Sequence, residues 1–134
     1  LGLLTAPQIR TVSASPGAAT RVDAIEPWSE QRVAELRAQG RTVFVDFTAD
    51  WCITCKVNEH VALDTAAVHQ AFAAQQVVWL QGDWTRADPA ITRLLAQYGR
   101  SGVPLYLLYV KGGEPKVLPQ LLTPSMVVDA LKAG

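Results

Sequence analysis

The chain has 134 residues, and its 12 basic and 12 acidic side chains give a formal net charge of zero at neutral pH. Hydrophobic residues make up 49% of the chain and charged residues 18%, which is typical of one ordinary domain with its own core and unlike a disordered or fibrous chain. The balanced charge argues against a nucleic-acid-binding protein, because neutralising phosphates needs a surplus of Lys and Arg on one face.

The ends of the chain predict a domain preceded by a connecting segment. The longest apolar run, residues 103–110, is far short of the roughly 18 to 20 residues that span a bilayer. The chain begins without Met and without the basic start of a signal peptide, so we expect it to be a piece of a longer protein. Residues 1–21 are rich in small residues and Pro and predict a linker or flexible arm, with the domain over residues 22–134.

The first predicted helix begins after Ser29, a residue type that caps helices, and reaches about Gln39. Gly40 then supplies the left-handed residue that ends it. The run of β-branched and aromatic residues over 41–48 predicts a strand buried on both faces, which we place at the centre of a sheet.

A second helix is predicted to begin at the cysteines. Ile53, Val57 and Val61 are spaced by four and form its expected buried stripe. Asp64 is the predicted N-cap of a following short helix. The buried residues of that short helix are expected to be Val68 and Phe72.

The next strand is predicted at residues 77–80. Asp88 followed by Pro89 is a strong helix start, because proline fits the first helical position. That helix should end at Gly99 and bury the side chains that recur at helical spacing. These are Ile91, Leu94, Leu95 and Tyr98.

The C-terminal part predicts a hairpin and a last helix. A strand over 105–110, a turn at 111–114 and a short strand over 116–118 form the hairpin, and Thr123 caps the last helix. The order of elements predicts a layered α/β domain, with parallel crossovers first and an antiparallel hairpin last.

The two cysteines, Cys52 and Cys55, form a Cys-X-X-Cys pair between the central strand and a helix. At the helix N-terminus, backbone N–H groups and the helix dipole favour the thiolate of Cys52. Cys55 lies one turn later and can attack a mixed disulfide on Cys52, which releases the partner as a thiol. The pair can therefore exchange two electrons with another dithiol.

Two acidic residues are candidates to assist the dithiol. Glu59 falls near the helix face that carries Cys52 and Cys55. Asp46 lies inside an apolar strand, where burial should raise its pKa, and it is a candidate acceptor for the proton of Cys55.

The segment VFVDFTADWCITCK, residues 43–56, resembles the active-site strand and helix start of the thioredoxin superfamily. Val103-Pro104 is similar to the second element of that family, a cis-proline that faces the dithiol. The resemblance implies a thioredoxin-like α/β fold, in which helices flank a central mixed β-sheet and the Cys-X-X-Cys pair stands at a helix N-terminus.

Within the superfamily, residues 49–56, Glu59 and the Asp83-Trp84-Thr85 loop resemble the C-terminal periplasmic domain of the DsbD and ScsB-like membrane reductases. The resemblance implies a periplasmic domain of an inner-membrane protein. Such a domain takes electrons from a transmembrane domain and passes them to an N-terminal periplasmic domain. Residues 1–21 would then connect the last membrane helix to this domain.

The resemblance also implies residue roles. Cys52 would be the attacking thiol and Cys55 the resolving one, while Asp46 and Glu59 would tune Cys52. Val103 and Pro104 would shape the docking surface, and Trp51 either packs beside Cys52 or contacts a partner. We expect no dissociable cofactor, because the Cys52–Cys55 disulfide carries the electrons, and we expect the isolated domain to be monomeric.

Two alternatives stay open at the level of the sequence. Ile53-Thr54 stands where cytosolic thioredoxins carry Gly-Pro, so the partner range is not fixed, and a free-standing thioredoxin of general specificity is one alternative. The other is a metal-binding module, since His60 and His69 nominally complete a Cys2His2 set with the two cysteines.

Overall fold

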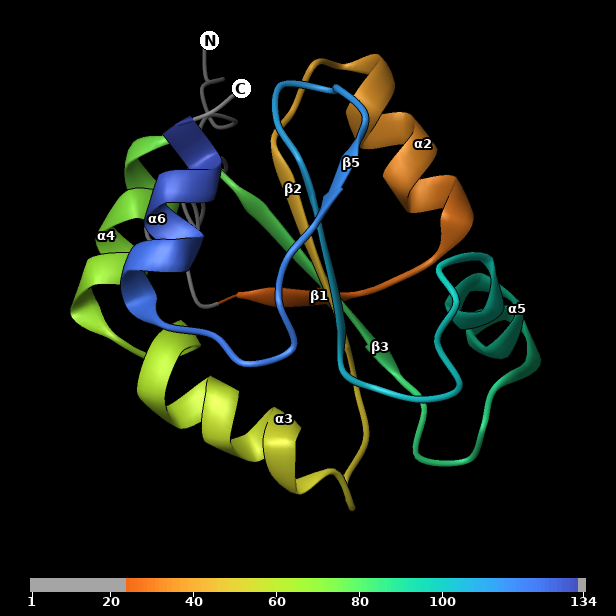
Figure 1. Cartoon of the computed structure of the whole chain (residues 1–134). Coiled ribbons are helices and arrows are strands. Elements are labelled where there is room, and N and C mark those ends of the chain that lie inside the picture. Colours follow the sequence, from red (N-terminus) through yellow and green to blue (C-terminus); the bar gives the residue numbers. More distant parts are fainter. Residues whose placement is uncertain (1–23, 133–134) are drawn as a thin grey trace, which may run out of the picture.

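The computed structural model of the protein describes residues 24–132, so the predicted connecting segment, residues 1–21, lies outside the described residues. Helices and strands alternate through most of the described chain (Figure 1). In chain order the elements are β1 Ile25–Pro27, α2 Glu30–Ala38, β2 Val43–Thr48, α3 Ile53–Asn58, the π-helical turn η2 Glu59–Leu63, α4 Ala66–Ala74, β3 Val78–Asp83, α5 Pro89–Gln97, β4 Leu105–Tyr109, β5 Pro115–Val117 and α6 Pro124–Lys132.

A mixed sheet of five strands, in the order β1-β3-β2-β4-β5, forms the centre of the described chain. β1, β3 and β2 run parallel, and β4 and β5 join as an antiparallel hairpin. This confirms the predicted α/β class, with β2 as the buried central strand. The edge strand β1 was not predicted, because three residues are too few to show an alternating pattern.

Helices cover both faces of the sheet, with α3, α4 and α6 on one side and α2 and α5 on the other (Figure 1). Successive residues of a strand point to opposite faces, so β2 contributes to two cores. Phe44 joins the core under α4 and α6, which includes Phe72, Trp79, Tyr106, Val127 and Leu131. Val45 and Phe47 join the core under α2 and α5, which includes Val33, Leu36, Leu80, Ile91 and Leu95.

The predicted helix ends are confirmed where side-chain caps set them. Ser29 Oγ accepts a hydrogen bond from the backbone N–H of Arg32 at the start of α2, and an Asp88 carboxylate oxygen accepts one from Ile91 at the start of α5. Gly40 and Gly99 follow these helices with φ of +74° and +71°, the left-handed conformation that favours glycine.

The predicted buried stripe of the second helix is wrong. Ile53, Val57 and Val61 are 76%, 46% and 50% exposed. The residues buried instead are Cys55, Asn58, Ala62 and Leu63. Cys52 caps α3 and thereby directs Cys55 and Asn58 inward, and the π-helical turn that follows adds a residue per turn and brings Ala62 and Leu63 to the core.

The predicted N-cap of the next helix is displaced by one residue. Thr65 caps α4, since its Oγ1 accepts a hydrogen bond from the N–H of Val68 at 3.4 Å. Asp64 instead ends η2, with its N–H 2.7 Å from the carbonyl oxygen of Glu59. The expected burial of Val68 and Phe72 is confirmed. Asp and Thr are both good caps, so local sequence does not choose between these neighbours.

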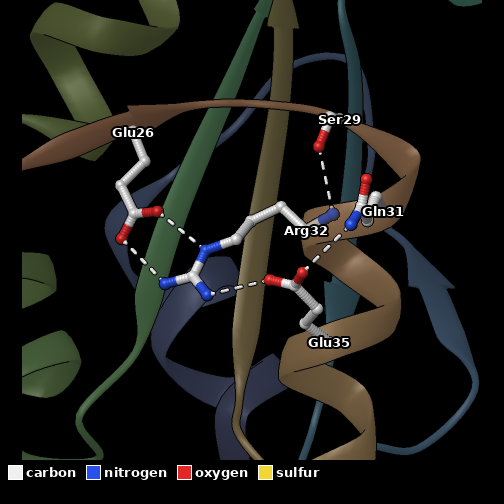
Figure 2. A network of polar contacts seen from close by, with 5 residues as sticks. All are labelled: Glu26, Ser29, Gln31, Arg32 and Glu35. Carbon is white, nitrogen blue, oxygen red and sulfur yellow. Dashed lines mark hydrogen bonds and ion pairs between the residues drawn. The ribbon is translucent and has the colours of Figure 1, made fainter.

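Edge strand β1 is tied to α2 by side chains as well as by its ladder with β3. Arg32 lies 3.0 Å from Glu26 and 3.4 Å from Glu35, so its guanidinium joins the strand to the helix (Figure 2). These side chains are partly exposed, and ion pairs between exposed side chains add little to the stability of a fold. The network therefore chiefly fixes the direction in which the chain passes from β1 into α2.

Candidate active site

The two cysteines form a disulfide at the start of α3, at the end of the loop that leaves β2. Cys52 is the N-cap residue, and its Sγ accepts the N–H of Cys55 at 3.1 Å. Cys52 is 6% exposed and Cys55 1%, so Cys52 is the more accessible sulfur. In the dithiol form the same N–H stabilises a thiolate on Cys52.

The loop before β4 lies directly against Cys52. The Val103–Pro104 peptide is cis, as expected, and the carbonyl oxygen of Val103 lies 4.0 Å from Cys52 Sγ. Arg100 Nη1 donates to the carbonyl oxygen of Pro104 at 2.9 Å, which ties this loop to the end of α5. Ala49, both cysteines and Val103 form a small apolar cluster.

Trp51 is 57% exposed beside Cys52 and is fixed by the loop after β3. Its Nε1 donates to the carbonyl oxygen of Thr85 at 3.1 Å, while the N–H of Asp50 donates to Thr85 Oγ1 at 2.9 Å. The ring contacts Trp84, with centroids 5.9 Å apart. Thr85 is itself held by Asp83, which accepts its N–H at 2.9 Å. The ring is therefore held at the surface next to the disulfide.

Asp46 is buried in the middle of β2 and points to the same face of the sheet as Phe44, because residues two apart on a strand share a face. Burial raises the pKa of its carboxyl to about 6, the hydrogen bond from Gln81 opposes that rise, and the charge of Glu59 adds to it. This confirms the expected direction. A base with a pKa near 6 can take up and return protons near neutral pH.

Glu59 is half-buried at the junction of α3 and η2. It lines a cavity of about 440 Å³ together with Lys56, Thr48 and Gln81. The structure thus brings Asp46 and Glu59 close enough for their charges to interact, on the side of α3 that faces the sheet. Neither carboxylate is hydrogen-bonded to a cysteine within the described residues.

Asn58 is buried one turn after Cys55 and fastens the active-site helix to the C-terminal part of the fold. Its Nδ2 donates to Tyr106 Oη at 2.9 Å and to the carbonyl oxygen of Gln120 at 2.7 Å. Its Oδ1 accepts the N–H of Leu122 at 3.0 Å. A fully satisfied buried amide of this kind fixes the rotation of α3 about its axis.

Sequence reasoning missed Asn58 and Gln81, and it named Thr85 only as part of the Asp83-Trp84-Thr85 loop, without a role. The Asp83-Trp84-Thr85 spacing is an available signal for Thr85, because Asp side chains often accept the N–H two residues later. Asn58 and Gln81 carry no local signal, since their partners are 35 or more residues away.

The four residues of the metal alternative do not come together. Residues 24–132 hold no group of three or more His, Cys, Asp or Glu side chains that could bind a metal ion. His69 instead lies 3.4 Å from Asp64.

Among residues 24–132, no helix has the length and apolar character that a membrane span requires.

Comparison with known proteins decides the family. The family model described as thioredoxin-like matches residues 24–111, which includes the disulfide and the cis-proline. The chain belongs to the thioredoxin-like family. The solution structure of a Thermus thermophilus thioredoxin is similar to this thioredoxin-like chain in fold, with a TM-score of 0.62 and 21% identity over 81% of this chain and 84% of that one.

Among thioredoxin-like proteins, the chain is similar to DsbD. It is 38% identical over 82 residues to thiol:disulfide interchange protein DsbD 1 of Pseudomonas aeruginosa, an alignment that covers 61% of this chain and 14% of that relative. The chain thus spans about one seventh of that relative's length. The crystal structure of the oxidised DsbD C-terminal domain of Neisseria meningitidis has a TM-score of 0.63 and 25% identity, over 82% of this chain and 98% of that one.

The expected resemblance to the DsbD C-terminal domain is therefore confirmed. With the Cys52–Cys55 disulfide capping a helix beside the cis-proline loop, this likeness supports protein-disulfide reductase activity by thiol–disulfide exchange.

Proposed function

We propose that this chain is an electron-relay domain of a DsbD-type reductase, working in the periplasm as part of a membrane protein. It would accept electrons from a transmembrane domain and pass them to an N-terminal periplasmic domain of the same protein. The observation that carries this proposal is the match to 98% of the Neisseria meningitidis DsbD C-terminal domain, with the disulfide at the start of α3. We assign the domain to residues 22–134 and the connection to the membrane to residues 1–21.

The proposed reaction begins when the Cys52 thiolate attacks one sulfur of the partner disulfide. A Cys52–partner bond forms, and the other partner sulfur leaves as a thiolate with the electrons of the broken bond. Cys55 then attacks Cys52 Sγ, the Cys52–Cys55 bond forms, and the second partner sulfur leaves and takes up a proton. The domain is oxidised by two electrons and the partner is reduced by two.

The order of attack follows from exposure. Cys52 retains more accessible surface than Cys55 and lies at the helix N-terminus, so it supports the intermolecular step, and Cys55 is placed for the intramolecular one. Asp46, with a pKa near 6, is the proposed acceptor of the Cys55 proton, and Glu59 is proposed to tune the same site through its charge.

The docking surface is proposed to consist of the Trp51 ring and the Val103–Pro104 loop. The carbonyl oxygen of Val103 lies beside Cys52 Sγ, where it can accept an N–H from an extended partner chain. Trp51 is exposed on the same side, and exposed aromatic rings of this kind are common anchors at protein interfaces.

The reduction potential of the Cys52/Cys55 couple tests the relay. The chain is equilibrated in graded glutathione buffers, free thiols are alkylated, and the products are weighed by mass spectrometry. We expect a value of about −220 to −270 mV, on the reducing side of the known range. A value near about −120 mV, typical of a strong oxidant, would contradict the relay.

Partner selectivity separates the relay from a general thioredoxin. The reduced chain is mixed with an N-terminal DsbD domain or with insulin, and the loss of its thiols is followed. Rapid oxidation by the DsbD domain and slow oxidation by insulin is the expected result, with Cys52→Ser as the inactive control. Equal rates with both substrates would favour a general reductase.

A further inference from the structure

Gln81 is the hydrogen-bond donor to the buried acid of the site. Its Nε2 lies 3.1 Å from Asp46 Oδ2. The two residues are direct neighbours in the parallel ladder of β2 and β3, so the contact is fixed by strand register and does not depend on a loop. Gln81 is half-buried and also lines the 440 Å³ cavity beside Glu59, so it lies between Asp46 and that cavity.

Other groups near Asp46 do not replace this donor. Trp79 Nε1 is buried and has no hydrogen-bond partner within the described residues, and it lowers the Asp46 pKa less than Gln81 does. Tyr106, opposite Asp46 on β4, has its hydroxyl engaged with Asn58. The charged and titratable side chains that line this cavity are Asp50, Lys56, Glu59, Asp64, His69 and Asp83. Cys55 faces inward from α3, and Tyr106 pairs with Asp46 from β4.

We propose that Gln81 is a positioning residue of the resolving step, holding Oδ2 of Asp46 so that Oδ1 accepts the Cys55 proton. This inference rests on the proposed role of Asp46 as proton acceptor. In that step the Cys55 S–H bond breaks and its proton bonds to Asp46, while the remaining electron pair of Cys55 attacks Cys52 Sγ. The Cys52–Cys55 bond forms as the Cys52–partner bond breaks, and the partner sulfur leaves as a thiolate with the electrons of that bond.

The neutrality of the Gln81 amide suits this role. A hydrogen bond to the carboxylate favours the ionised form and counters part of the effect of burial on the pKa. A cation at the same place would stabilise the carboxylate more strongly and make it a weaker base. The amide therefore fixes the geometry of the carboxylate while leaving it able to take up a proton near neutral pH.

The pH dependence of the resolving step tests the proposal in the 134-residue chain. Reduced protein is mixed with dithiobisnitrobenzoate, and coloured thiolate is released twice. The first release reports attack by Cys52, and the second, concentration-independent release reports attack by Cys55. The rate of the second release is plotted against pH, and the midpoint of that profile is compared between variants. Gln81→Met keeps the length of the side chain but has no donor, so we expect the midpoint to move up by about one pH unit. This shift corresponds to about tenfold slower release below the midpoint.

Control variants make the outcome specific. Gln97→Met, a matched change at an exposed position on α5, should leave the midpoint unchanged. If Gln81→Met does not fold, Gln81→Glu places a second acid beside Asp46 and should also raise the midpoint, by repulsion. An unmoved midpoint in a folded Gln81 variant overturns the inference.

Asp46→Asn separates this inference from the proposed function. If Asp46→Asn leaves the pH profile of the second release intact, Asp46 is not the proton acceptor and both proposals about the resolving step fail. If Asp46→Asn removes the midpoint near pH 6 while Gln81→Met leaves it in place, Asp46 keeps its role and only the role of Gln81 is wrong.

Discussion

Asp46 shows how one residue can favour chemistry at the expense of stability. Its carboxyl is buried on the central strand, with one hydrogen bond from Gln81, and its pKa rises from 3.8 to about 6. Below about pH 4 the carboxyl is protonated in both folded and unfolded chains. Between about pH 4 and 6 the unfolded chain loses its proton first, so this group destabilises the fold increasingly as the pH rises.

Asp46→Asn should therefore stabilise the oxidised protein at neutral pH. The shift of about two pKa units corresponds to about 3 kcal/mol in the free energy of unfolding above pH 6, and the gain should shrink to near zero at pH 4. Urea unfolding of both proteins from pH 4 to 8 measures it. A difference that is constant with pH would rule out ionisation of Asp46 as the cause.

The acids also act on Cys52. The helix N-terminus favours the Cys52 thiolate, and the negative charges of Asp46 and Glu59 oppose it. We expect the Cys52 pKa to fall by on the order of one unit in Asp46→Asn and in Glu59→Gln, since a carboxylate in a medium of intermediate dielectric contributes about that much.

Thiolate absorbance or alkylation rate against pH measures the pKa of Cys52. Asp64→Asn is the matched control, because that side chain is 75% exposed and its charge is screened by water. If the Cys52 pKa is unchanged in both site variants, the acids do not tune the reactive thiol.

At the scale of elements, the rotation of α3 about its axis decides which residues face the core. Cys52 at the N-cap, the buried Asn58 amide and the π-helical turn together direct Cys55 and Leu63 inward. The aliphatic side chains of Ile53, Val57 and Val61 are left on the outer face. The apolar residues at helical spacing, Ile53, Val57 and Val61, therefore form an exposed ridge on α3 and η2 and do not pack against the core.

This assignment predicts unequal costs of substitution along the segment. Val57→Ser should change the free energy of unfolding by less than about 0.5 kcal/mol, because the side chain is already half exposed. Leu63→Ala should lower it by about 2 to 5 kcal/mol, because it empties a fully buried site. Urea unfolding compares the two, and similar costs would contradict the observed rotation of the helix.

At the scale of the whole molecule, the sheet is the layer that both cores share. Gly82 on β3 lies beside Phe47 of the neighbouring strand β2 and close to Ile91 of α5, both of which belong to the core under α2 and α5. A Cβ at Gly82 would lie 2.7 Å from Phe47 Cε1 and 3.1 Å from Ile91 Cδ1, closer than van der Waals contact allows. Both neighbours are buried and have little room to move.

Gly82→Ala is therefore expected to lower the free energy of unfolding by about 1 to 3 kcal/mol, the range for overpacking a core. Gly102→Ala is the control, since a Cβ there would meet Trp84 at an ordinary 3.5 Å. Equal unfolding midpoints for the two variants would show that Phe47 and Ile91 can move aside without cost.

The sequence by itself determined the features that depend on neighbouring residues. The Cys-X-X-Cys pair at a helix start, the caps at Ser29 and Asp88 and the glycine stop at Gly40 are all set within a few residues, as is the buried run of β2. These signals were enough to identify the fold class and the reactive pair, because local backbone geometry and the hydrophobic period act over short distances.

Only the tertiary structure decided which partner each polar group meets. Gln81 reaches Asp46 across 35 residues and Asn58 reaches Leu122 across 64, and no local pattern encodes such contacts. The same is true of the exposed ridge on α3 and η2. Periodicity shows that one helix face is apolar, but the elements that pack around the helix determine whether that face is buried.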